Sequence, residues 1–365
     1  MKIDDFCTYG PKSTIKAGAA TKDGQYMFFT SSEDESKRYS DYQLDGEGVI
    51  MGTGGNATLH YYSGKYAVST DCIVLLPDDR VRCKYLYYFF LANMQLLEAG
   101  FKGAGLKHTN KKYIGNIELK KIPSLQEQNE VVDKLDRLSK IIQCRNEELA
   151  ILDELIKARF VEMFGDPVQN EKEWQTKALE DSCKSIIDCP HSTPNYTSED
   201  TGFMCIRTSI VKKNRIMWED IEYIPEKEYI ERIQRKKPEK GDVIYTREGA
   251  ILGIAAVIDR DCNVALGQRS MLLSPDRDFC TPEFISVAMN FDSFLDNALK
   301  GMSGSASPHI NVGDIKAFKM ILPPIEQQEA FSAFVVQVDK SKVAIQKSLD
   351  ETQLLFDSLM QKYFG

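Results

Sequence analysis

The segment IPSLQEQ, from Ile122 to Gln128, reappears with similar residues as LPPIEQQ, from Leu322 to Gln328. A second match joins MFG, which ends at Gly165, to YFG, which ends at Gly365. Both pairs are separated by 200 positions. Because one offset fits two matches that lie far apart in the sequence, we interpret the 365 residues as an internal repeat of two similar halves, 1–165 and 166–365.

The residues between the two matches predict a long helix in each half. Apolar residues recur at helical spacing in the first half, interrupted by Arg145: Leu135, Leu138, Ile142, Leu149, Leu152 and Ile156. The same positions of the second half hold Val335, Val338, Lys342, Leu349, Thr352 and Phe356. A helix from Gln126 to Phe164 would be about 58 Å long. Since it cannot bury this stripe alone, we expect the two helices to pair as an antiparallel coiled coil with a few polar register positions. The alternative is that each helix docks on a core of its own.

The repeat continues upstream in a weaker form. Val49–Gly55 parallels Val243–Gly249, and His108–Asn110 parallels His309–Asn311. Short β-branched and aromatic runs predict strands at Tyr26–Thr30, Gly48–Met51, Leu59–Tyr62, Asp242–Thr246, Ile254–Ile258 and Ser270–Leu273. Helical patterns cover Lys84–Leu97 and Pro282–Leu299. The expected fold class is α+β: two similar strand-rich domains, each followed by a long helix, with the two helices pairing in a pseudo-two-fold repeat. We place the domains at 1–125 and 166–324 and the helices at 126–165 and 325–365.

Composition limits the class of protein. No apolar run is long enough to span a membrane and the first residues do not resemble a signal peptide, so we expect a cytoplasmic protein. The nine cysteines form no C-x-x-C pair, which favours reduced thiols used as small apolar side chains.

The formal net charge of −8 counts against nucleic-acid binding. Local basic clusters keep it open, although such clusters are more often solvated surface: Lys107, Lys111, Lys112, Lys120 and Lys121; Arg207, Lys212, Lys213 and Arg215; Arg232, Arg235, Lys236, Lys237 and Lys240.

The common catalytic signatures are missing from the sequence. There is no phosphate-binding G-x-x-x-x-G-K-[ST], no N-P-P-Y or D-P-P-Y of adenine methyltransferases, and no G-x-S-x-G nucleophile turn. The four histidines show no metal-ligand spacing. We therefore expect a non-catalytic protein without a metal site.

The duplicated segments of this sequence resemble those of a known family. Leu322–Gln328 resembles the L-P-P-x-x-E-Q signature of the specificity subunits of type I restriction-modification systems, and Ile122–Gln128 is the same element with Ser124 in place of the second proline. Gly241–Thr246 with Gly249 resembles the family's G-D-[IV]-[IL]-x-[ST]…G strand, whereas Glu47–Ile50 lacks the Gly-Asp pair. The loop Ser303–Ser305, with Gly103–Gly105 in the first half, resembles the family's small-residue loop.

The resemblance implies a function. Each target-recognition domain would read one half of a split site in double-stranded DNA, and the helices would set the spacer between the half-sites. The helices would also dock methyltransferase subunits, of which two are expected, and a motor-nuclease subunit would complete the complex. S-adenosylmethionine is expected on the methyltransferase subunits, which flip and methylate adenine, so this chain would bind no cofactor and contact no membrane.

Base-reading residues are expected to be polar and to lie on loops. In the first domain the candidates are Thr30, Ser31, Thr53, Asn56, Ser69, Thr70, Lys102 and Lys107. In the second they are Thr208, Ser209, Arg247, Gln268, Arg269, Ser303 and Ser305, with Lys212 and Lys213 on phosphates. For each of them a structural role in a turn or a cap is an equal alternative.

Two other functions stay open. The chain could be a non-catalytic coiled-coil adaptor that binds protein partners rather than DNA, which the acidic balance favours. It could also be a self-sufficient nuclease, which the missing motifs disfavour.

Overall fold

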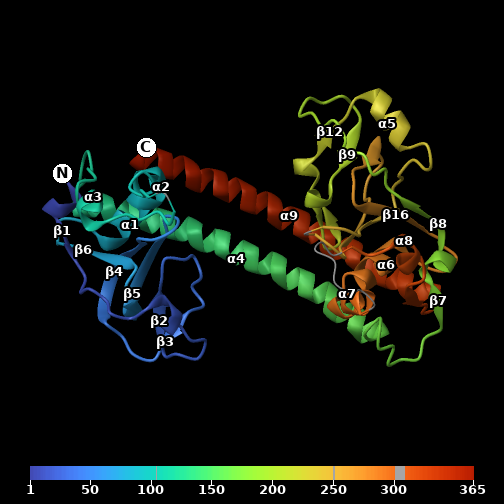
Figure 1. Cartoon of the computed structure of the whole chain (residues 1–365), viewed down its shortest axis with the longest axis horizontal. Helices are drawn as coiled ribbons and strands as arrows, with labels where there is room; N and C mark the ends of the chain where they lie inside the picture. Colours follow the sequence, from blue (N-terminus) through green and yellow to red (C-terminus); the bar gives the residue numbers. More distant parts are fainter. Residues whose placement is uncertain (104, 250, 301–308) are drawn as a thin grey trace. The chain divides into compact units, whose positions relative to one another are not determined.

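The computed structural model describes residues 1–103, 105–249, 251–300 and 309–365. The chain forms two compact units, which are described separately (Figure 1). Unit 1 comprises Met1–Glu147 and Gln346–Gly365, and unit 2 comprises Glu148–Ile345. Each unit therefore contains a strand-rich domain, the first part of one long helix and the last part of the other.

The domain of unit 1 is built on a six-stranded sheet with the order β1-β6-β4-β5-β2-β3. Its strands are β1 (Cys7–Tyr9), β2 (Tyr26–Phe29), β3 (Arg38–Tyr39), β4 (Leu44–Gly52), β5 (Leu59–Val68) and β6 (Cys72–Pro77). Its short helices are α1 (Cys83–Ala92), α2 (Met94–Glu98) and α3 (Lys111–Gly115). Strand β4 pairs antiparallel with β5 and β6, whereas β2 pairs in parallel with the end of β5. Side chains of β4 and α1, such as Val49 and Leu86, meet in one buried core.

The domain of unit 2 repeats this connectivity. Its four-stranded sheet has the order β14-β13-β16-β8, which matches β5-β4-β6-β1 of unit 1. The strands of the unit are β7 (Thr176–Ala178), β8 (Cys183–Asp188), β9 (Met204–Ile206), β10 (Val211–Lys212), β11 (Arg215–Ile216), β12 (Glu222–Tyr223), β13 (Val243–Thr246), β14 (Ala255–Val257), β15 (Val264–Leu266), β16 (Ser270–Pro275) and β17 (Lys319–Ile321). Strand β15 pairs in parallel with β9, as β5 does with β2, so the long β5 corresponds to β14 and β15 separated by a loop.

The helices also follow the repeat. Unit 2 contains α5 (Glu226–Arg232), α6 (Pro282–Met289), α7 (Asp292–Leu299) and α8 (Val312–Lys316), and the last three correspond to α1, α2 and α3. The two long helices are α4 (Leu125–Phe164) and α9 (Ile325–Phe364), so their bounds differ by the same 200 positions as the sequence matches. Short 3-10 helices lie at Ile3–Asp5, Ala17–Ala19, Leu179–Ser182, Thr208–Ile210 and Trp218–Asp220. The internal repeat and the α+β fold class are thus confirmed.

Two helices expected to be continuous are each broken. The pattern over Lys84–Leu97 predicted one helix, but α1 ends and α2 begins around Asn93, whose side chain donates to the carbonyl oxygen of Phe89 at 2.9 Å. In unit 2 the helix expected over Pro282–Leu299 breaks at Asn290, whose side chain donates to the carbonyl oxygen of Ala255 at 2.8 Å. Asparagine competes for backbone hydrogen bonds, and the apolar spacing did not reveal this.

Within unit 2 the two long helices run antiparallel. The rings of Phe160 on α4 and Phe331 on α9 lie 5.4 Å apart, and Asp153 on α4 bonds to Lys342 on α9 at 2.6 Å. Residue numbers therefore fall along α4 as they rise along α9. Phe160 and Phe331 are fully buried in the domain core together with Phe284 of α6. The coiled-coil pairing that the apolar stripe predicted is confirmed in this unit.

Unit 1 uses the complementary ends of the same helices. Val131 and Leu135 of α4 and Met360 and Phe364 of α9 are buried in the core of the domain. The carbonyl oxygen of Phe364 accepts a hydrogen bond from the Asn93 side chain at 3.2 Å. The start of one helix and the end of the other thus fill each domain core.

A buried glutamine fixes the start of each long helix on its domain. Gln128 and Gln328 both have fully buried side chains. The Gln128 side chain accepts from the Arg82 backbone at 2.8 Å and donates to the carbonyl oxygens of Arg80 and Pro123 at 3.0 and 2.9 Å. These three hydrogen bonds give a partner to the amide oxygen and to both amide hydrogens of the buried side chain.

Gln328 repeats these contacts in unit 2. Its side chain accepts from the Thr281 backbone at 3.2 Å and donates to the carbonyl oxygens of Phe279 and Pro323 at 3.0 and 2.8 Å. The motif that occurs twice in the sequence, at 122–128 and 322–328, therefore forms the same attachment between domain and long helix in each unit.

Ser124, which replaces the second proline of the motif in the first copy, caps the start of α4. Its hydroxyl accepts from the Glu127 backbone at 3.3 Å, and its own backbone donates to the Glu127 carboxylate at 2.8 Å. These reciprocal bonds form a capping box at the start of α4. The hydrogen bonds from Ser124 also lower the pKa of Glu127.

Lys342 is a polar position in the apolar seam of unit 2. Its side chain is 10% exposed, and its ammonium group lies 2.6 Å from Asp153 and 3.5 Å from Asp339. In any other register of the two helices, the largely buried Lys342 would lose its Asp153 partner. The ion pair therefore favours the observed register.

We expect Gln328→Ala to lower the free energy of unfolding by about 2–4 kcal/mol, because it leaves three backbone groups unpaired and opens a cavity. The matched control is Gln327→Ala, which removes an exposed side chain from the neighbouring position and should cost less than about 0.5 kcal/mol. Chemical denaturation of the full-length chain measures both. Equal losses of unfolding free energy in the two variants would contradict the role of Gln328 in attaching α9 to its domain.

We expect Lys342→Ala to destabilise the chain by about 1–2 kcal/mol near neutral pH. Burial raises the pKa of Asp339, and the Lys342 ammonium opposes this rise. For a carboxyl group with a raised pKa, the stability it contributes is present at low pH and lost as the pH rises through the folded-state pKa. Removing the cation raises that pKa further, so the loss should shrink on acidification.

Thermal unfolding at about pH 7 and about pH 4.5 measures this difference. Lys340→Ala, an exposed lysine of the same helix, is the control. A loss that is independent of pH would contradict the role of Asp339.

Candidate nucleic-acid interface

Several of the expected base-reading residues of unit 1 meet where strands β2, β4 and β5 end. The Ser31 hydroxyl donates to the carbonyl oxygen of Asp71 at 2.6 Å, and the Thr53 hydroxyl donates to the same oxygen at 2.9 Å. The Thr53 backbone donates to the Ser31 hydroxyl at 3.0 Å. These contacts fasten three loops to one another, so part of the expected surface is a rigid framework.

Two further candidates face inward. Thr30 is buried and its hydroxyl accepts from the Lys37 ammonium at 2.9 Å. Ser69 is fully buried and its hydroxyl donates to the Asp71 carboxylate. Both side chains already have partners within the domain, which suits the turn role that was the alternative for them.

The remaining candidates of unit 1 are exposed. Asn56, Thr70, Lys102 and Lys107 all have exposed side chains. The Gly55 backbone donates to the carbonyl oxygen of Lys107 at 2.9 Å, which brings the loop that carries Asn56 against the loop that carries Lys107. The exposed side chains of Asn56 and Lys107 are therefore carried by adjoining loops.

In unit 2, Arg247 lies inside the domain. Its guanidinium is 8% exposed and donates to the Asp188 carboxylate at 3.0 and 3.4 Å. Its backbone donates to the carbonyl oxygen of Arg269, which is exposed and adopts a φ of +66°. Arg247 therefore orders the loop from which Arg269 projects.

The other candidates of unit 2 form a second group. Thr208 is half-buried and Ser209 exposed, on the 3-10 helix after β9. Lys212 donates to the carbonyl oxygen of Ser209 at 2.9 Å, and Lys213 bonds to Asp292 at 2.9 Å. Ser303 and Ser305 lie outside the described residues. The role of all these residues in DNA contact stays a prediction.

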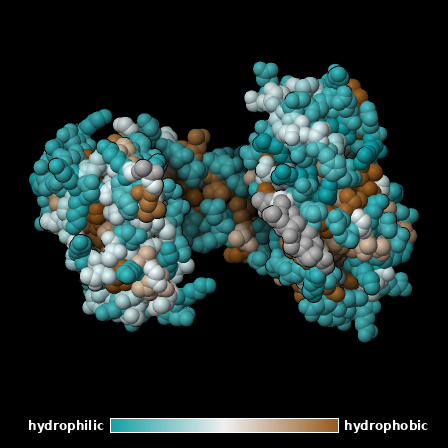
Figure 2. Space-filling model, in the orientation of Figure 1, coloured by the Kyte–Doolittle hydropathy of each residue, from teal (hydrophilic) through white to brown (hydrophobic). Residues whose placement is uncertain are grey.

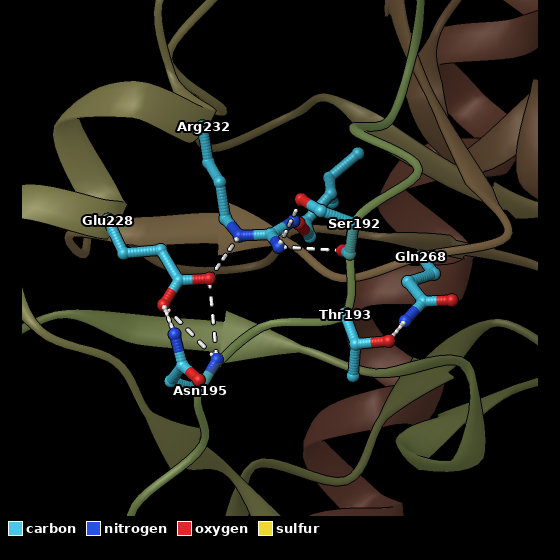
Figure 3. A network of polar contacts seen from close by, with 7 residues as sticks. Ser192, Thr193, Asn195, Glu228, Arg232 and Gln268 are labelled. Carbon is cyan, nitrogen blue, oxygen red and sulfur yellow. Dashed lines mark hydrogen bonds and ion pairs between the residues drawn. The ribbon is translucent and has the colours of Figure 1, made fainter.

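A polar network that the sequence did not reveal lies beside Gln268 (Figure 3). The side chain of Arg232, at the end of α5, is 3% exposed. Its guanidinium bonds to the Glu228 carboxylate at 3.1 Å and donates to the carbonyl oxygens of Ser192 at 2.8 Å and Leu266 at 3.2 Å. The sequence showed Arg232 only as part of a basic cluster, because the 192–195 loop that buries it is distant in the chain.

Glu228 holds the other end of this loop. Its carboxylate accepts from the backbone and the side chain of Asn195, each at 3.1 Å. Burial works to raise the pKa of Glu228, but the hydrogen bonds from Asn195 and Arg232 outweigh it and hold the pKa below its ordinary value. The carboxylate is therefore charged at neutral pH.

An open cavity of about 440 Å³ lies against this network and is lined by Pro190, Ser192, Thr193, Asn195, Pro225, Lys227, Glu228, Glu231 and Arg232. Within the described ranges no three His, Cys, Asp or Glu side chains are placed to hold a metal ion together. Nor does any helix of those ranges have the length and apolarity to cross a bilayer.

The comparisons with known proteins agree with this architecture. A family model described as the type I restriction modification DNA specificity domain matches residues 1–153 and again residues 171–352. The MjaVIII specificity subunit of Methanocaldococcus jannaschii is 22% identical over 306 residues, which cover 80% of this chain and 72% of that protein. The EcoDI specificity subunit of Escherichia coli is 22% identical over 393 residues, covering 95% and 82% of the two proteins.

A solved structure shares the fold. The S subunit of a type I restriction-modification system from M. genitalium aligns over 100% of this chain and 95% of its own, with a TM-score of 0.68 and 14% identity. The two family-model matches together span most of the sequence, and one lies in each half of the internal repeat. The chain belongs to the family of type I restriction-modification DNA specificity proteins.

Proposed function

We propose that this chain is the DNA-reading subunit of a type I restriction-modification complex, in which each domain reads one half of a split DNA site. The observation that carries the proposal is the double occurrence of the specificity domain in one chain, each copy fixed to the long helices by an equivalent buried glutamine. Two similar readers on one helical frame suit two half-sites separated by a fixed spacer. The role is recognition, and catalysis belongs to partner subunits.

The loops at the strand ends support the placement of the reading surfaces. In unit 1, exposed Asn56, Lys102 and Lys107 lie on loops whose backbones bond to one another and to Thr53 of the hydrogen-bonded framework. In unit 2, Arg269 and Gln268 follow β15 on a loop ordered by Arg247. Rigid frameworks with exposed amides and cations match the needs of base reading and phosphate contact.

The long helices offer surfaces for the methyltransferase subunits. Exposed apolar side chains occur along both: Ile141, Ile151, Leu155, Val161, Val336, Val343, Leu354 and Leu355. Leu155 and Leu355 occupy equivalent positions of the repeat and are 44% and 50% exposed. Hydrophobic surface is visible along the helices in Figure 2. A repeated apolar position suits two copies of one partner, and we propose two methyltransferase subunits and one motor-nuclease subunit.

The acidic balance fits a chain that works within a complex. Several cations of the basic clusters have carboxylate partners in their own unit, as in the pairs Arg207–Glu222 and Lys236–Asp242. Partner subunits would then supply much of the phosphate contact, which dominates affinity for DNA.

Co-expression with an adenine methyltransferase subunit in a host without endogenous adenine methylation tests the proposal. We expect N6-methyladenine in a split motif, because each domain contributes an independent half-site. Omitting this chain is the control. A contiguous motif, or no methylation by an active partner, would contradict the proposal and favour the protein-binding adaptor.

A matched pair of arginine variants separates framework from contact. Arg247→Ala should lower the free energy of unfolding by about 2–4 kcal/mol, since it leaves the Asp188 carboxylate without its guanidinium partner in a largely buried place. Arg269→Ala should leave stability within about 0.5 kcal/mol of wild type and weaken DNA binding by the assembled complex. Denaturation and a low-salt gel shift measure the two effects. The opposite assignment would contradict the placement of Arg269 on the reading surface.

A further inference from the structure

We infer that Gln268 reads one adenine of the half-site of unit 2, and that Thr193 and Arg232 are positioning residues that hold the Gln268 amide and its neighbouring loop. The inference rests on the proposed function. It assigns adenine to the contact already expected of Gln268, and positioning roles to Thr193 and Arg232.

The segment 189–195, which follows β8, is irregular, yet it is anchored at three points that include Asp188 at the end of β8. Asp188 pairs with Arg247 at 3.0 Å. The carbonyl oxygen and the hydroxyl of Ser192 accept from the Arg232 guanidinium at 2.8 and 3.2 Å. Asn195 donates to Glu228 at 3.1 Å from both its backbone and its side chain. A loop held in this way presents its intervening side chains in one fixed geometry.

Thr193 is an exposed residue between two of these anchors. Its hydroxyl accepts a hydrogen bond from the Gln268 side-chain amide. Figure 3 shows the two side chains pointing toward each other, with the Gln268 carbonyl oxygen on the side away from Thr193. The hydrogen bond thus holds the amide in place and leaves its carbonyl oxygen and second hydrogen for another partner.

The chemistry of that partner follows from the amide. A glutamine with one acceptor and one donor side by side matches the N6 amino group and N7 of adenine in the major groove. Cations adjoin the loop at two places: Lys227 lines the cavity with Thr193 and Asn195, and Arg235 donates to the carbonyl oxygen of Asp188 at 3.5 Å. A fixed amide flanked by exposed cations suits a base contact beside phosphates.

Arg232 joins the two chain segments that carry the pair. One nitrogen of its guanidinium bonds to Ser192, and another donates to the carbonyl oxygen of Leu266, two residues before Gln268. Only a planar guanidinium supplies donors to Glu228, Ser192 and Leu266 at once, and the Lys ammonium lacks this geometry. Burying the charge is costly unless all of these bonds are made, so the arrangement favours a single loop geometry.

The support for this loop is particular to unit 2. Helix α5 lies in the connection between β12 and β13. In unit 1 the corresponding connection between β3 and β4 is residues 40–43, all of which the structure describes, and it contains no helix. Loss of the contacts that Arg232 and Glu228 make with this loop should therefore affect the half-site of unit 2 and leave the other half-site unchanged.

The test uses the complete complex and sequences the methylated motif. Gln268→Ala should reduce the preference for adenine at one position by roughly 10- to 100-fold. Thr193→Val should weaken the same preference to a smaller extent, because the amide is kept but its orientation is released. Gln175→Ala, an exposed amide of unit 2 outside this loop, is the control and should leave the motif unchanged.

Arg232 is tested through base preference and not through activity alone. Arg232→Lys should make the same half-site degenerate, and Arg232→Met should do so more strongly. Asn195→Ala removes one anchor while Arg232 and Glu228 stay paired. It therefore tests whether the anchored loop determines the base preference, even if an Arg232 variant does not fold. A purely structural role would lower methylation at every site without altering the bases accepted.

The outcomes separate the two levels of the proposal. If the wild-type complex methylates no split site, the proposed function fails. If it does so but Gln268→Ala and Thr193→Val keep the wild-type motif, the inference alone fails. Changes confined to one position of one half-site, the same for both variants, support it.

Discussion

A helix of 40 residues with one apolar stripe needs a partner along its length, and the rest of the structure follows from how this need is met. The chain provides two such helices, α4 and α9, with equivalent stripes. In unit 2 they run antiparallel, and Lys342 with Asp153 favours one register. Because the helices are antiparallel, each domain core receives the beginning of one helix and the end of the other, as Phe331 and Phe160 show in unit 2. Within each unit, the ends of the two helices and the domain therefore share one hydrophobic core.

On this frame the two domains keep one topology and differ in their loops. The sheet order β5-β4-β6-β1 recurs as β14-β13-β16-β8, although β5 is continuous where β14 and β15 are interrupted. Strand pairing tolerates such a break because the buried side chains alternate along each strand and the backbone groups of the loop reach solvent. The differences gather at strand ends and in α5, the places where recognition surfaces are expected.

The sequence predicted the frame better than the surfaces. The repeat predicted one long helix in each half, because a repeated stripe leaves a regular pattern. The two helices, α4 and α9, begin 200 positions apart, at Leu125 and Ile325. The breaks at Asn93 and Asn290 were missed, since the hydrogen bonds that cause them form only after folding. Arg232 was assigned to a basic surface, because the loop that buries it lies 40 residues away in the chain. The exposed candidates Asn56, Lys102 and Arg269 follow from turn chemistry, but turn chemistry does not say which base each of them contacts.

The buried glutamines have a consequence for how such a protein changes during evolution. The hydrogen bonds described from Gln128 and Gln328 to the segments around Arg80 and Phe279 all go to backbone atoms. Every residue offers the same carbonyl oxygen, and all except proline offer the same N–H, so the attachment point does not depend on the side chains of the domain. A domain with a different recognition surface can therefore use the same attachment, and the specificity of one half can drift while its connection to the helices is inherited unchanged.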